Sequence, residues 1–197
     1  MILLMDGSDS VTNIQMHSMK MMIHNLILGY NTGATATKIG LGVYGMTTLR
    51  GNGYYTNQLL YNKLELTDYL AGMTQVGGSR HLGAALQYSI NRFGGLQYGN
   101  KKVFIAFVTG SNQIADMLIF QQMAVLIQST GHELYIVAFG HRIGWQQQYA
   151  GVVGGTNIYH VININAMPDY LHRLLILNMP IECGCLFVVV IVVVVVL

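Results

Sequence analysis

Three oxygen-bearing side chains, Asp6, Ser8 and Ser10, follow a short apolar segment near the start of the chain. The segment, residues 2–5, is continuously apolar, which is typical of a buried parallel strand. Ligands of open α/β sheets bind just beyond the carboxyl ends of such strands. Hard divalent cations such as Mg²⁺ take oxygen ligands, and water fills the rest of their coordination shell. The spacing therefore predicts a strand-to-helix loop with the donors of a cation site.

Apolar strands alternate with amphipathic helices along the rest of the chain, and this alternation favours an α/β fold. We expect a doubly wound, mostly parallel six-stranded sheet with helices on both faces. One of its strands is predicted at 47–55, where Arg50-Gly51-Asn52-Gly53 between two β-prone runs indicates a hairpin. The other predicted strands are 2–6, 37–44, 102–109, 133–140 and 159–164, and the predicted helices are 10–30, 62–73, a segment ending near 93, 113–130, 145–151 and 169–178.

The Asp-x-Ser-x-Ser motif after a first apolar strand resembles the metal-ion-dependent adhesion site of von Willebrand factor type A domains. The longer string Met5–Val11 resembles the collagen type VI and matrilin members, and the strands at 37–44 and 133–140 also resemble family strands. The resemblance covers residues 1 to about 180 and leaves 181–197 as a separate tail of unknown role. It also implies that 47–55 is the one antiparallel edge strand of the sheet. It implies an extracellular-matrix module that binds other matrix proteins or collagen chains and helps assemble microfibrils.

Two residues depart from the family pattern at this site. Arg80 stands where the family has a metal-binding threonine, and Gly110 stands where it has the aspartate that completes the site. Only Asp6, Ser8 and Ser10 remain of the five members. An inward Arg80 could pair with Asp6 in the place of the ion, whereas an outward Arg80 would leave a weak, water-rich site. The resemblance thus implies a degenerate adhesion site that requires no cofactor and binds Mg²⁺ weakly at most.

Two other interpretations of the early loop stay open. Asp and Ser residues after a strand also form turns and cap helices, without binding anything. The alternative function is a metal-dependent cell-adhesion or receptor domain that binds its ligand through Mg²⁺. In either binding interpretation, the candidate contact residues beside the loop are Asp9, Ser79, His81, Ser111 and His141.

No recognisable catalytic set accompanies the fold, and we expect no enzymatic activity. A phosphatase of the haloacid dehalogenase type needs a second aspartate two positions after the first, where this chain has serine. Gly7 stands alone rather than in a dinucleotide-binding Gly-x-Gly-x-x-Gly motif. His17 and His24 share one helix without a third metal ligand, and His160 and His172 have no nucleophile at a recognisable spacing.

The composition excludes some classes of partner. Charged residues make up only 9% of the chain, against about 25% in typical soluble domains. The net charge is +2 without a basic run, which argues against nucleic acid. A bridge between Cys183 and Cys185 would be strained, so pairing with another chain is the easier outcome in an oxidising compartment.

The two ends of the chain bear on its location. Residues 186–197 are all apolar, and eight of the twelve are valine. The run is shorter than the ~20 apolar residues of a membrane helix. It is the stub of a membrane anchor, an added strand or a non-natural sequence, and we expect membrane contact only in the first case. Met1 lies almost on the first strand, so the chain is either cytoplasmic or a fragment, and the resemblance favours a secreted fragment of a longer matrix protein.

Overall fold

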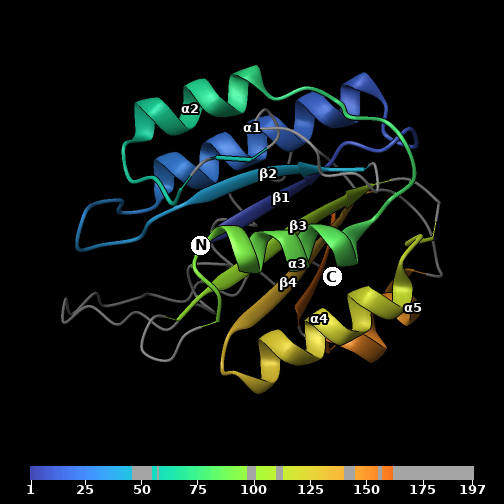
Figure 1. Ribbon diagram of the computed structural model, residues 1–197. Coiled ribbons are helices and arrows are strands. Elements are labelled where there is room, and N and C mark those ends of the chain that lie inside the picture. The colour runs from blue at the N-terminus through green and yellow to red at the C-terminus, as the bar shows by residue number, and fades with distance from the viewer. Residues whose placement is uncertain are drawn as a thin grey trace, which may run out of the picture.

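The computed structural model describes residues 1–45, 55–56, 58–96, 101–109, 113–139, 145–154 and 157–161. Strands alternate with helices through these ranges, as the sequence predicted, with two consecutive helices between the second and third strands (Figure 1). The elements are β1 (Ile2–Asp6), α1 (Asn13–Gly29), β2 (Gly40–Tyr44), α2 (Lys63–Gly72), α3 (Leu82–Arg92), β3 (Val103–Thr109), α4 (Met117–Ser129), β4 (Glu133–Phe139), α5 (Trp145–Val153) and β5 (Ile158–Val161).

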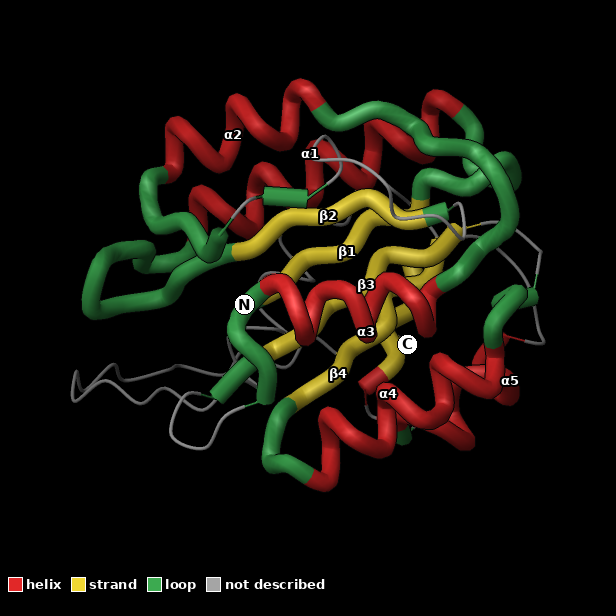
Figure 2. Tube along the Cα trace, viewed as in Figure 1, coloured by secondary structure: helices red, strands yellow, loops and turns green. Residues whose placement is uncertain are grey.

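The strands form one parallel sheet in the order β2-β1-β3-β4-β5. Helices α1 and α2 cover one face, and α3, α4 and α5 cover the other (Figures 1 and 2). The doubly wound α/β arrangement is therefore confirmed. Strand β1 lies between β2 and β3, and Met5 pairs in register with Val43 and Phe107. The loop that follows β1 consequently begins in the middle of the sheet.

The expected six strands with one antiparallel edge are not what the described residues form. They contain five parallel strands. Tyr55 and Leu60 each make one isolated antiparallel bridge, to Gly42 and Ile39 respectively, and a single bridge lacks the repeated hydrogen bonds of a ladder. Most of the predicted edge strand, including its hairpin turn, and the predicted helix 169–178 lie outside the described residues.

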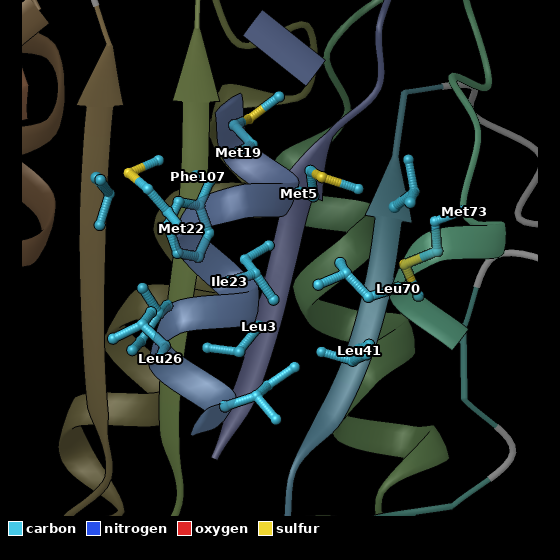
Figure 3. Close-up of a cluster of buried hydrophobic side chains, with 14 of the residues drawn as sticks. Leu3, Met5, Met19, Met22, Ile23, Leu26, Leu41, Leu70, Met73 and Phe107 are labelled. Carbon is cyan, nitrogen blue, oxygen red and sulfur yellow. The ribbon is translucent and has the colours of Figure 1, made fainter. Parts of the chain in front are cut away.

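The two sheet faces bury separate apolar clusters, and these fix the position of β1. On the first face, side chains of α1 such as Met19 and Met22 pack over Met5 of β1 and Phe107 of β3 (Figure 3). All five residues of β1 are buried. Full burial of such an apolar side chain contributes about 1.5–3 kcal/mol, so β1 is a firm base for its loop.

Helix α1 begins later than the sequence suggested, at Asn13 rather than near Ser10. Thr12 and Gln15 form a capping box, in which Gln15 Oε1 accepts from the Thr12 N–H at 2.9 Å and Thr12 Oγ1 accepts from the Gln15 N–H at 3.3 Å. The box satisfies two free N–H groups and fixes the first turn. Ser10 therefore belongs to the loop, where its hydroxyl is available to the site.

Candidate functional site at the carboxyl end of β1

The loop after β1 brings its three predicted oxygen donors together. Asp6 is completely buried at the end of β1, and its Oδ1 accepts a hydrogen bond from the Ser8 N–H at 3.0 Å. The hydroxyls of Ser8 and Ser10 are hydrogen-bonded to each other at 2.8 Å. Acceptors thus converge on one small volume above the sheet centre, as the Asp-x-Ser-x-Ser spacing requires.

A second loop, between α2 and α3, lies directly against the first. Gln75 Nε2 donates to the carbonyls of Ser8 and Val11, at 2.7 and 3.0 Å. Gly77 and Gly78 follow with positive φ angles of 76° and 73°, a conformation that glycine adopts without steric cost. Their turn carries the chain back across the β1 loop and places the side chain of Arg80 over Asp6.

Arg80, in this second loop, points inward and fills the space above Asp6. Its side chain lies almost wholly below the surface, and its Nε donates to Asp6 Oδ2 at 2.7 Å. Its Nη2 donates to Ser10 Oγ at 3.1 Å and also to the carbonyl of Thr109. Of the two orientations predicted for Arg80, the structure has the inward one, in which the guanidinium pairs with Asp6.

Thr109, at the end of β3, is a member of the site that the sequence reasoning missed. Its N–H donates to Asp6 Oδ2 at 3.3 Å, and its carbonyl accepts from Arg80. The available signal was its place at the end of a strand that was predicted to lie in the centre of the sheet. Its hydroxyl is buried without a hydrogen-bond partner, so Thr109 contacts Asp6 and Arg80 through its backbone.

The charges of the site are those of Asp6 and Arg80. Burial opposes ionisation of Arg80, but the charge of Asp6 raises the pKa of its guanidinium above the usual value. Burial raises the pKa of Tyr149 to about 12 although Arg80 opposes the shift, and burial also raises the pKa of Tyr44. Both tyrosines are consequently neutral at physiological pH, and Arg80 remains cationic beside its carboxylate.

A divalent cation does not fit the site while the guanidinium is in place. Both oxygens of Asp6 already accept hydrogen bonds, and the hydroxyl of Ser10 accepts from Arg80. Two unit charges ~4 Å apart interact by about 4 kcal/mol at the effective dielectric of a protein surface, and a dication doubles this repulsion. Within the described ranges, no group of three or more His, Cys, Asp or Glu side chains offers another metal site.

The remaining predicted contact residues have different positions. Asp9 and Ser79 are exposed beside the site. Their loops are joined by the Asp9 N–H, which donates to the carbonyl of Gly78 at 2.9 Å. The Nδ1 of His81 lies 2.9 Å from the carbonyls of Gly45 and Ser79. These contacts fix the position of the ring at the edge of the site. The other predicted positions, Gly110, Ser111 and His141, lie outside the described residues.

Asp116 holds the start of α3 and so fixes the loop that carries Arg80. Its carboxylate accepts from the N–H groups of Gly83 and Ala84 at 3.1 and 2.7 Å, whereas the N-cap residue His81 makes no side-chain cap.

We expect Asp116→Ala to lower the free energy of unfolding by about 0.5–2 kcal/mol, the usual cost of a lost cap. Urea denaturation measures the change, with Asp68→Ala on the exposed surface of α2 as the control. Equal stability of both variants would contradict this role.

Comparisons with known proteins agree with the fold. The family model of the von Willebrand factor type A domain matches residues 1–170. Among solved structures, proximal thread matrix protein 1 from the mussel byssus, with a zinc-occupied adhesion site, superposes with a TM-score of 0.72 at 14% identity, over 89% of this chain and 44% of that chain. The chain thus spans less than half the length of that protein.

Two further solved structures are similar. Manganese-loaded TRAP protein of Plasmodium vivax has a TM-score of 0.64 at 14% identity, over 88% of this chain and 71% of that chain. A von Willebrand factor type A protein from Catenulispora acidiphila has a TM-score of 0.64 at 11% identity, over 87% and 40% respectively. A search of curated proteins found no match. Among the helices described, none has the length and apolar character needed to cross a bilayer.

Proposed function

The chain belongs to the von Willebrand factor type A domain family, and we propose that it binds proteins of the extracellular matrix without a divalent cation and without catalysis. Domains of this family generally mediate protein–protein interaction, often through a metal-dependent adhesion site. The proposed role is a contact and assembly module of the collagen type VI and matrilin kind, within a longer secreted protein. Its partners would be other matrix proteins or collagen chains.

The observation that carries the proposal is the buried ion pair of Arg80 with Asp6 at 2.7 Å. In a working adhesion site, the ion binds the loop hydroxyls and leaves a coordination position for a carboxylate of the ligand. Here the guanidinium donates to Asp6, to Ser10 and to the carbonyl of Thr109, and only 2% of the residue is exposed. It supplies the positive charge that stabilises the loop but offers no open position to a partner.

Partner contact would then fall on the rim of the site rather than on its centre. Asp9 and Ser79 are exposed there, on two loops that are hydrogen-bonded to each other. His81 stands beside them, and its ring is held by backbone carbonyls. A rim that is fixed by the buried ion pair keeps one shape in the presence or absence of metal. Cys183 or Cys185 could add a covalent link to a neighbouring chain in an oxidising compartment.

A metal-dependent adhesion domain is the second candidate function. It is favoured by the solved relatives whose site holds zinc or whose structure is loaded with manganese. It requires Arg80 to leave its buried position, and this exposes the carboxylate of Asp6 to the incoming ion. The two candidates therefore differ in their response to metal ions.

Titration with Mg²⁺ and Mn²⁺ tests the proposal. We expect no binding heat and no shift in the thermal midpoint at millimolar concentrations, because the guanidinium repels the ion. A ligand at 100 times its dissociation constant would stabilise the fold by about 2.7 kcal/mol, and a shift of that size is easily measured. Micromolar affinity for either ion in the unmodified chain would overturn the proposal in favour of the metal-dependent alternative.

A further inference from the structure

We propose that copies of this domain associate head to tail, with the outer face of α1 in one copy seated on the outer face of α4 in the next. The inference rests on the proposed role in matrix assembly and names one partner, a second copy of this chain. The two surfaces are called the α1 stripe (Ile14, Met21 and Leu28) and the α4 stripe (Leu118, Val125 and Leu126).

The α1 stripe is a line of large apolar side chains on the solvent side of a helix. Ile14, Met21 and Leu28 are 76%, 48% and 50% exposed. They are seven residues apart, which places them on one face at intervals of about 10.5 Å. The opposite side of α1 is also apolar, since it packs on the sheet (Figure 3). A helix with apolar residues on both sides is typical of one that is covered on both sides.

The α4 stripe lies along a shallow groove. Leu118 and Val125, also seven residues apart, are 67% and 61% exposed, and Leu126 is 40% exposed. These side chains line a groove of about 490 Å³ together with Gln121, Gln122 and Ser129. Both stripes therefore present apolar side chains at the same interval. Side chains of a facing helix can insert between the side chains that line the groove.

The charge distribution favours a second copy as the occupant. Residues 117–129 contain no charged residue, and residues 14–28 contain only Lys20 besides His17 and His24, which are counted as neutral at pH 7. The Nζ of Lys20 donates to the carbonyl of Ala71 at 2.9 Å and so points to α2. Contact between the two stripes would neither leave a charge buried without a partner nor bring like charges together. A strongly acidic or basic partner would find no complementary charge on either stripe.

The position of the stripes determines the type of assembly. Helices α1 and α4 lie on opposite faces of the sheet (Figure 1). A domain with two different complementary surfaces on opposite sides forms a heterologous contact, which repeats into an open chain unless rotation closes it. A contact between single helices is at the small end of specific interfaces, so each contact is weak. Repetition within a longer matrix protein would raise the effective concentration.

A complementation experiment tests this contact. Met21→Glu on the α1 stripe and Val125→Glu on the α4 stripe each place a charge at the centre of one surface. We expect either variant of the full chain to show at least a tenfold lower association constant in sedimentation velocity under reducing conditions, because the carboxylate loses its hydration in the contact. An equimolar mixture should form a 1:1 dimer, since each variant retains the surface that the other needs.

The controls separate this contact from other associations. Leu64→Glu on α2 alters an exposed leucine outside both stripes and should associate as the unmodified chain does. Ile14→Glu provides a second α1-stripe variant if Met21→Glu does not fold, as judged by circular dichroism.

Loss of association in Val125→Glu alone would indicate a two-fold α4 contact. Unchanged association in both stripe variants would indicate contact through the tail. A monomeric unmodified chain, or destabilisation by Ile14→Glu without any change in association, would show that the stripe is uncovered or covered by the chain itself. Each of these four results overturns the inference, while metal-independent binding of another matrix protein would still support the proposed function.

Discussion

Replacing Arg80 with methionine is expected to lower the free energy of unfolding by about 3–5 kcal/mol, the usual cost of removing one partner from a buried ion pair. The Asp6 carboxylate would remain fully buried without its counter-charge. In a domain of this size, each kcal/mol shifts the thermal midpoint by roughly 2–4 °C, so a fall of about 10 °C is expected. Urea denaturation and thermal unfolding measure both quantities.

The matched control is the double variant Asp6→Asn with Arg80→Met. It leaves no uncompensated charge, and the amide oxygen can still accept from the N–H groups of Ser8 or Thr109, which contact Asp6 in the structure. We expect it to recover most of the stability lost by Arg80→Met. A loss below about 1 kcal/mol in the single variant would place the pair in the range of exposed salt bridges and contradict its structural role.

The second large effect is a gain of metal binding in the double variant Arg80→Thr with Gly110→Asp. The changes remove a positive charge, add a negative one and introduce the two residues that the predicted correspondence with the family motif assigns to these positions. We expect the affinity for Mn²⁺ or Mg²⁺ to rise by about 100-fold or more, equivalent to about 2.7 kcal/mol. Isothermal titration calorimetry measures the gain directly, and the thermal midpoint should rise with added ion.

The single variants identify the source of that gain. Gly110→Asp alone retains the guanidinium and should remain unresponsive to metal, whereas Arg80→Thr alone should bind weakly. If the folded double variant ignored millimolar Mn²⁺, the correspondence of Arg80 and Gly110 with the family's ligand positions would be wrong.

Sequence patterns predicted the arrangement of the site better than the state of its central residue. The apolar run of β1 and its Asp-x-Ser-x-Ser sequence identified the loop, because strand burial and loop position follow from local pattern. The direction of Arg80 was left open. This direction depends on the turn at Gly77 and Gly78 and on the hydrogen bond from Gln75 to the β1 loop. The hydrogen bond joins segments that are far apart in the sequence.

Other differences have the same origin. The role of Asp116 as the cap of α3 joins residues more than 30 positions apart, and no local spacing reports such a bond. Helix α1 begins later than predicted because Thr12 and Gln15 form a capping box. The Thr-x-x-Gln spacing in the sequence is the local signal of this box. The antiparallel edge was inferred from a turn motif between two β-prone runs and from the family resemblance, although a ladder also requires a partner strand in register.

The most direct test of the central claim is a crystal structure of the unmodified chain soaked in Mn²⁺, with the ion located by its anomalous signal. We predict no manganese peak above Asp6 and a guanidinium of Arg80 within hydrogen-bonding distance of that carboxylate. A manganese peak bound by the hydroxyls of Ser8 and Ser10, with Arg80 turned outward, would contradict the account.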